Sequence, residues 1–289
     1  MAAALGQTIR SVIQRQSRRQ LGIYGSAFVR FIFGLPFSVI VLLVVVGGSK
    51  VLAFDPATGF FAWLFLASMV QIIFTIVLGY AFQSGNFATA IALSKTDALQ
   101  AALFEMLLLS LIPDARLAVA ISVGCVAILL IANARSNTGL AGFLAHKKSL
   151  ALGLLAGLCL GSCSVFFRLA MDCLGEYDLL ERAILTSCLA TVIQALLMGG
   201  CLMLWRPAEL LACMQSWRQS SLAGAIAAGT TFMWFVAFSM MSVASVRMLG
   251  QIEIVLSLLF SIYVFKEKVP LLEIAGGVLI TFSVIVLLS

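Results

Sequence analysis

Charged side chains inside long apolar runs are the residues of this sequence with the clearest chemical potential. One such run carries Lys95 and Asp97, and another carries Arg247 and Glu253. A charge near the centre of a bilayer costs about 2.5–3.5 kcal/mol on insertion scales, so it normally faces a partner or a water-filled cavity. These four residues therefore either pair with one another across a helix bundle or bind a charged small molecule and a proton.

The spacing of these residues limits which of them can meet on one helix. Gln251 follows Arg247 by four residues, so the two share a helix face. Glu253 is six residues from Arg247 and points elsewhere unless the helix is distorted. Lys95 and Asp97 are two apart and cannot pair within one helix. The structural alternative is that Asp97 and Glu253 neutralise cations on neighbouring helices and only hold the bundle together.

The composition places these charges in a lipid bilayer. Of 289 residues, 62% are apolar and 10% are charged, whereas about 25% of the residues of a soluble domain are charged. The basic residues lie in short loops rather than along one helix, which argues against nucleic acid as a partner. One histidine and seven cysteines without a CxxC pair leave no pattern for a metal site or a Ser-His hydrolase. We expect no catalytic residue, no metal and no cofactor.

Apolar runs of suitable length predict ten transmembrane helices, the first of them short. They cover residues 2–14, 23–46, 59–82, 86–112, 116–133, 150–171, 180–204, 222–241, 243–265 and 271–288. The runs lack the alternation of barrel strands, so the expected fold is an all-α integral membrane protein. Pro36 predicts a kink in the second helix, and the stripe Gly153, Gly157 and Gly161 predicts close helix packing.

Basic residues recur at a constant offset, which indicates an internal duplication. The matched pairs are Arg15 with Arg168 at 153 residues, and Arg30 with Arg182, Lys95 with Arg247 and Arg116 with Lys268 at 152. The predicted domains are a first five-helix repeat over residues 1–145 and a second over residues 146–289. An odd number of helices per repeat inverts the second copy in the membrane.

The loop charges predict an orientation. Loops one–two, five–six, seven–eight and nine–ten carry most of the lysines and arginines, so this face is expected to be cytoplasmic and both termini outside. Arg30 and Arg182, near the ends of their helices, are expected to extend to the interface. We expect a bacterial inner (plasma) membrane location and a monomer or weak homodimer.

The layout and several short motifs resemble the EamA-type transporters of the drug/metabolite transporter superfamily. The motifs are Gly250-Gln251-Ile252-Glu253, Phe265-Lys266-Glu267-Lys268, the arginines at 30 and 182, and Ser94-Lys95-Thr96-Asp97. The resemblance implies ten helices in two inverted repeats and transport as the activity. The sequence departs from many relatives in having Glu253-Ile254 and Asp97-Ala98 where they carry Glu-Pro, and in its short first helix.

The predicted function is secondary active transport, as an exporter, of a small organic metabolite such as an amino acid or related amphoteric compound. The candidate substrate-binding residues are Lys95, Arg247, Gln251, Asn86, Ser94 and Trp234, and the candidate proton-coupling residues are Glu253 and Asp97. A proton or an exchanged metabolite is the expected coupling partner. The alternatives are a passive channel or facilitator and a non-transporting membrane scaffold; the absence of a GxxxxGK[ST] motif argues against ATP-driven transport.

Overall fold

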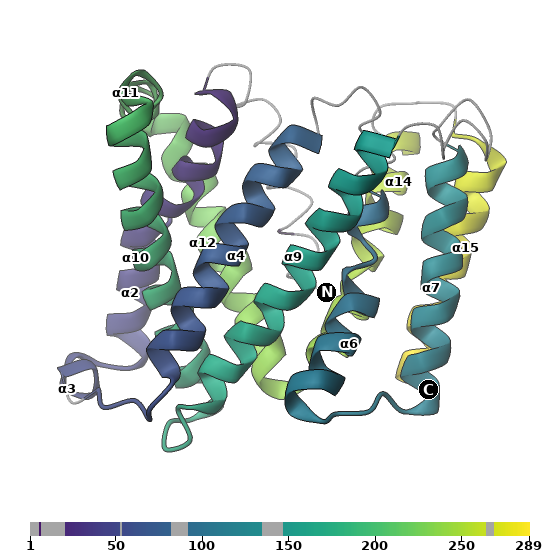
Figure 1. The fold of residues 1–289 in the computed structure, drawn as a ribbon, viewed down its shortest axis with the longest axis horizontal. Helices are drawn as coiled ribbons and strands as arrows, with labels where there is room; N and C mark the ends of the chain where they lie inside the picture. Colours follow the sequence, from purple (N-terminus) through teal and green to yellow (C-terminus); the bar gives the residue numbers. More distant parts are fainter. Residues whose placement is uncertain (1–5, 7–20, 53, 82–91, 135–146, 264–268) are drawn as a thin grey trace.

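The computed structural model describes Gly6 and residues 21–52, 54–81, 92–134, 147–263 and 269–289, and all regular structure in these residues is helical. After a helix over residues 21–32 come α2 (Leu35–Val45), α3 (Gly48–Leu52), α4 (Phe60–Ala81), α6 (Asp97–Leu109), α7 (Ala115–Ala134), α9 (Lys147–Asp172), α10 (Leu179–Trp205), α11 (Pro207–Gln215), α12 (Trp217–Met240), α13 (Val243–Gly250), α14 (Ile252–Tyr263) and α15 (Leu271–Leu288). The long helices run side by side, with the short α3 and α11 at opposite ends of the bundle (Figure 1).

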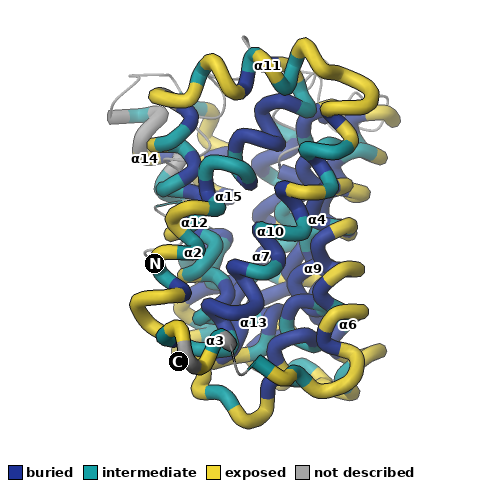
Figure 2. Tube along the Cα trace, turned by 90° about the vertical axis from the view of Figure 1, so that its left-hand side faces the viewer, coloured by how far each residue is buried: buried dark blue, intermediate teal, exposed yellow. Residues whose placement is uncertain are grey.

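Seven helices within the described residues are long and apolar enough to cross a membrane. They are Leu21–Val45, Phe60–Ala81, Ala115–Ala134, Lys147–Asp172, Leu179–Trp205, Ser220–Met240 and Leu271–Leu288. Their outer surfaces are strongly apolar: Leu196, for example, is 70% exposed, as expected for a surface that contacts lipid. Figure 2 shows the exposed and buried sides alternating along the helices.

Three of the ten predicted spans are not among these seven helices. Residues 2–14 lie outside the described part of the chain apart from Gly6. Residues 86–112 and 243–265, expected to be continuous helices, are each interrupted near their charged residues, so that α6 begins only at Asp97 and α13 is separated from α14 by Gln251. The count of ten spans stays a prediction.

Short-range turns interrupt both of these segments. The N–H groups of Lys95 and Thr96 donate to the carbonyls three residues earlier, at 3.0 and 3.1 Å, and the Gln251 N–H donates to Met248 O at 3.1 Å. Such turns redirect the chain and free backbone carbonyls that need another partner. The Gln251 side-chain amide donates to the carbonyl of Lys95 at 3.2 Å, so a side chain from one interruption satisfies the backbone of the other.

The helix that contains Pro36 is interrupted just before the proline. Helix 21–32 ends in a turn at Phe33 and Gly34, and Pro36 lies in the first turn of α2, where its missing N–H costs little. The backbone of Gly224 in α12 approaches Phe33 and Gly34 so closely that a Cβ on Gly224 would overlap the chain. The predicted kink is therefore present, at a backbone-to-backbone crossing.

The glycine stripe of α9 packs against the interrupted segment that leads into α6. A Cβ on Gly161 would lie 2.9 Å from Asp97 O and 3.0 Å from Ala101 N, and one on Gly157 would lie 3.2 Å from Ser94 O. The predicted packing role is confirmed for these two glycines. Through them α9 fixes the position of Asp97.

Contacts near the helix ends separate the two faces of the bundle. Lys50 Nζ lies 2.6 Å from Glu181 Oε1, which brings α3 next to the start of α10. At the other end the Arg206 guanidinium lies 5.0 Å from the Tyr24 ring, and the Glu209 carboxylate accepts from the Gly25 N–H at 3.1 Å. The described parts of loops two–three and six–seven therefore lie at one end of the bundle, and those next to loops one–two and seven–eight lie at the other, as their charges predicted.

Candidate functional site

Two ion pairs cross between the interrupted helices and define the centre of the site. Lys95 Nζ lies 2.6 Å from Glu253 Oε2, and Arg247 Nε lies 3.7 Å from Asp97 Oδ2. Each cation is thus paired with the carboxylate on the opposite segment. This arrangement joins the beginning of α6 to the junction of α13 and α14.

The pairing is possible because both segments are distorted. A regular helix would turn Glu253 away from Arg247, but the interruption at Gln251 brings both to one cavity, together with Gln251 itself and Lys95. The sequence predicted that Glu253 points away from Arg247 unless the helix is distorted; the helix is distorted, and both residues line the same cavity. Gln251 and Arg247 share a face, as the spacing predicted.

Asp97 and Arg247 interact less tightly than Lys95 and Glu253. The separation of 3.7 Å exceeds hydrogen-bonding distance, and Asp97 Oδ1 has no hydrogen-bond partner among the described residues although Asp97 is only 3% exposed. A buried carboxylate with unused acceptor capacity is costly. Asp97 is therefore available for a proton or a hydrogen-bond donor.

The Arg247 guanidinium has three further partners around it. It donates to Ser164 Oγ on α9, from Nε at 3.1 Å and from Nη2, and its Cζ lies 5.0 Å from the Trp234 ring and 5.2 Å from the Phe238 ring. Aromatic faces attract guanidinium groups. Trp234 in turn packs against Gly250, where a side chain would collide with the indole.

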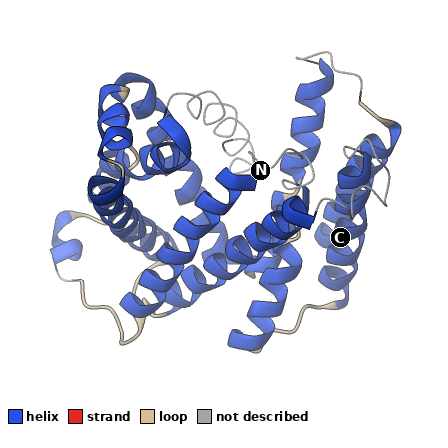
Figure 3. Cartoon of the chain, turned by 45° about the horizontal axis from the view of Figure 1, so that its top comes forward, coloured by secondary structure: helices blue, strands red, loops and turns tan. Residues whose placement is uncertain are grey.

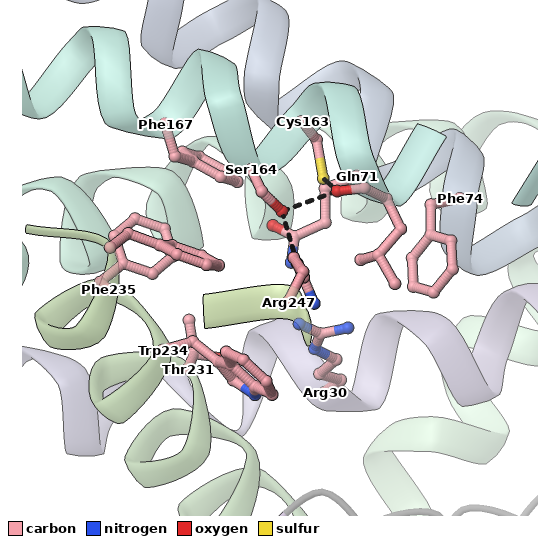
Figure 4. A pocket seen from close by; sticks show the side chains of 12 residues that line it. Arg30, Gln71, Phe74, Cys163, Ser164, Phe167, Thr231, Trp234, Phe235 and Arg247 are labelled. Carbon is pink, nitrogen blue, oxygen red and sulfur yellow. Dashed lines mark hydrogen bonds between the residues drawn. The ribbon is translucent and has the colours of Figure 1, made fainter. Parts of the chain in front are cut away.

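Two small cavities flank Arg247 and Trp234. One, of about 30 Å³, is lined by Arg30, Gln71, Ser164 and a group of aromatic residues (Figure 4). The other, of about 20 Å³, is lined by Lys95, Asp97, Gln251 and Glu253. A water molecule needs roughly 10–15 Å³ of such space, so in this conformation each cavity has room for about one to three waters. A metabolite fits only if the helices separate.

Arg30 corrects one expectation about the arginines. It was expected to extend to the membrane interface, but it faces the larger cavity together with Arg247 (Figure 4). Arg30 is partly buried within the helix over residues 21–32, three residues before the turn at Phe33. Arg182 does lie at a helix end, where it donates to the carbonyls of Tyr177 and Gly175 at 2.6 and 2.9 Å.

The remaining predicted residues fall into two groups. Ser94 is 4% exposed and lies beside Lys95 at the interruption, and Trp234 lines both cavities. Asn86 lies outside the described residues. The structure thus brings together Lys95, Asp97, Trp234, Arg247, Gln251 and Glu253.

Several cavity residues were not predicted from the sequence. Ser164 belongs to the repeated Ser-Val-x-x-Arg pattern, and Gln71 is a buried amide in the middle of α4 that accepts from Gln194 Nε2 at 2.6 Å. A polar side chain far from both ends of an apolar helix was the signal that would have identified Gln71.

Comparison with known proteins supports a family assignment for half of the chain. The sequence profile of the EamA-like transporter family matches residues 147–289. No curated protein matches the sequence significantly. Among 27 matching chains of solved structures, one, described only as a crystal structure of a protein, has a TM-score of 0.71 at 16% identity, over 99% of this chain and 93% of its own length. That likeness shows the fold. With its apolar helices, the chain is a multi-pass integral membrane protein.

Proposed function

Because residues 147–289 belong to the EamA-like transporter family, within the drug/metabolite transporter superfamily, we propose that this chain is a secondary transporter for a small organic metabolite. The metabolite binds at the crossed ion pairs between the interrupted helices. The proposed substrate is an amino acid or a related amphoteric compound, and the proposed direction is export across a bacterial inner membrane.

The arrangement of Arg247 is the observation that carries this proposal. Its guanidinium is held by Ser164 and Trp234 but lies 3.7 Å from Asp97, so a substrate carboxylate can replace the loose carboxylate contact without dismantling the other two. Arg30 faces the same cavity and adds positive charge there. Aromatic walls beside the guanidinium suit the apolar part of the same molecule.

A proton is the proposed coupling ion, with Asp97 or Glu253 as its carrier. Each carboxylate pairs with one cation across the site, and each loses that partner if the cation turns to a substrate carboxylate. A buried carboxylate without its cation is strongly disfavoured, so substrate binding and proton binding are linked at these residues.

Helix packing supports two inverted five-helix repeats, residues 1–145 and 146–289, as the basis of alternating access. Two pairs of elements that are equivalent under the 152-residue offset pack against each other: α7 against α15, and α2 against α10. α6 packs against α13, which lies in the predicted span equivalent to that of α6. A pseudo-two-fold axis between the copies would produce these contacts. Figure 3 shows the described part of the chain as packed helices joined by loops, with no strand among them.

A resistance screen followed by transport measurements tests the proposal. Strains that overproduce the protein are grown on inhibitory concentrations of each of the twenty amino acids, and the protective cases are repeated with purified protein in proteoliposomes. Lys95→Gln and Arg247→Gln should each abolish transport without loss of folded protein, while Arg218→Gln, on an exposed residue beside Trp217, should retain it. Unchanged transport by the first two variants would remove these residues from the site.

A further inference from the structure

The turn between α12 and α13 is held from two sides by side chains of opposite charge. The Glu105 carboxylate, on α6, accepts hydrogen bonds from the N–H groups of Val243 at 2.6 Å and Ala244 at 3.0 Å. Glu105 is only 3% exposed. A carboxylate at the first N–H groups of a helix satisfies donors that have no partner within the helix and interacts favourably with the helix dipole.

Arg168, on α9, holds the other side of the same turn. Its guanidinium donates to the carbonyl of Phe238 and, at 3.4 Å, to that of Met241, and Asp172 orients it through a contact of 2.9 Å. The C-terminal carbonyls of α12 carry the negative end of its dipole. Glu105 and Arg168, here called the clasp, are therefore each opposite in charge to the helix end that they contact: the carboxylate at the N-terminus of α13 and the guanidinium at the C-terminus of α12.

A buried aromatic layer lies between the clasp and the larger cavity. Phe167, Phe235 and Phe238 are each 2% exposed, with ring centroids 4.7 Å apart for Phe167 and Phe235 and 6.3 Å apart for Phe235 and Phe238. All three line the cavity. Phe167 directly precedes Arg168, and the Phe238 carbonyl accepts from the Arg168 guanidinium, so a displacement of the clasp also moves rings that line the cavity.

From this geometry we infer that Glu105 and Arg168 are gating residues, which keep the pathway closed at the end of the bundle that carries the α12–α13 turn. A gating role rests on the proposed transport function. The contacts of the clasp are between protein groups only, so they can be tested without a substrate. At the 152-residue offset the counterpart of Glu105 is Ser257. The opposite end of the bundle therefore has no carboxylate at the equivalent sequence position, and opening at the two ends involves different chemistry.

The test measures access to Cys163, a cavity-lining residue that is 1% exposed. In a full-length variant that keeps Cys163 as its sole cysteine, sealed vesicles are labelled with a membrane-impermeant thiosulfonate from one side at a time. A second variant, Asp55→Cys in a background without Cys163, identifies which side of the membrane the clasp faces. Asp55 is next to Phe54, whose ring contacts Tyr177 just beyond the end of α9, the helix that carries Arg168. Glu181→Gln is the matched control, since Glu181 also caps a helix N-terminus at this end.

Glu105→Gln removes the charge from two charge-assisted hydrogen bonds, so Cys163 should be labelled about tenfold faster from the marked side. Arg168→Gln should act in the same direction, and Glu181→Gln should label at the parent rate. If Glu105→Gln yields no folded protein, Glu105→Asp, which keeps the charge but shortens the reach, should give a smaller acceleration. Unchanged labelling in folded variants at both positions, or acceleration only from the opposite side, would overturn the inference. Because labelling needs no substrate, neither outcome bears on transport.

Discussion

At the scale of residues, the main finding is that Lys95 and Arg247 are each paired with the carboxylate of the other interrupted segment. The sequence indicated which residues matter, because charges inside apolar runs stand out. It did not indicate the partners, because the pairing Lys95–Glu253 and Arg247–Asp97 depends on interruptions that helical spacing does not contain. Arg30 was expected at the interface but faces the larger cavity, because the neighbouring helices, which spacing along one helix does not reveal, determine what a side chain faces.

The two lysine–glutamate pairs of the structure allow the effect of burial to be measured at equal separation. Both Lys95–Glu253 and Lys50–Glu181 span 2.6 Å, but the lysine side chains are 18% and 58% exposed. Lys95→Met leaves Glu253 buried without its cation, so it should lower the melting temperature in detergent clearly, by a free energy of up to about 3 kcal/mol after allowing for partial exposure.

The comparison includes its own control. Lys50→Met should lower the melting temperature less, because the Lys50 side chain is largely solvated and water screens this pair, although the Glu181 side chain, at 12% exposed, is as enclosed as Glu253 at 11%. Replacing Glu253 by Gln in the Lys95→Met background should recover part of the loss, since the uncompensated charge is then gone. Equal effects of the two lysine substitutions would show that the central pair is as solvated as the surface one.

At the scale of elements, the interruptions near Lys95 and at Gln251 are the features that sequence periodicity missed. Both segments are apolar enough that their sequences predict continuous helices. The carbonyl of Lys95, freed by the interruption, accepts from the side chain of Gln251, which is 156 residues away, so no local pattern indicates the interruption. The glycine stripe of α9 was predictable because its spacing alone indicates close packing. What it packs against was not.

A substitution at that stripe should disturb the site through the backbone. Gly161→Ala places a Cβ 2.9 Å from the carbonyl of Asp97, and overpacking of this kind costs about 1–3 kcal/mol. We expect a lower melting temperature together with reduced transport. Gly229→Ala is the matched control: Gly229 also lies in a long helix, but a Cβ there meets nothing within 4 Å, so stability should be equal or slightly higher. Equal behaviour of the two variants would contradict the packing described here.

At the scale of the whole molecule, the sequence was sufficient for the fold class and the family, and the structure added the geometry of the candidate site. Composition and loop charge were sufficient for an all-helical membrane protein, because both reflect the solvent that surrounds the chain. The two repeats remain a proposal that rests on the offset of the basic residues and on the packing of equivalent helices.

Orientation gives a direct prediction at this scale. The C-terminus lies at the same end of the bundle as α3 (Figure 1), and the loop charges predict that this end faces outward. Alkaline phosphatase fused to Ser289 should be active, and a fluorescent protein that matures only in the cytoplasm should be dark. A second fusion within residues 135–146, the link that the sequence predicts between the two repeats, should give the reverse pattern. A fluorescent C-terminal fusion would invert the assignment.

The central claim is that this molecule is a carrier whose site is organised by Arg247, and counterflow tests it most directly. Proteoliposomes are loaded with an excess of the unlabelled amino acid that the resistance screen selects, and uptake of the labelled compound is followed. The account predicts a transient accumulation of label above the external concentration, saturable in substrate and abolished by Arg247→Gln. Unsaturable uptake that never exceeds equilibrium, and that Arg247→Gln leaves unchanged, would contradict it and identify a passive pore.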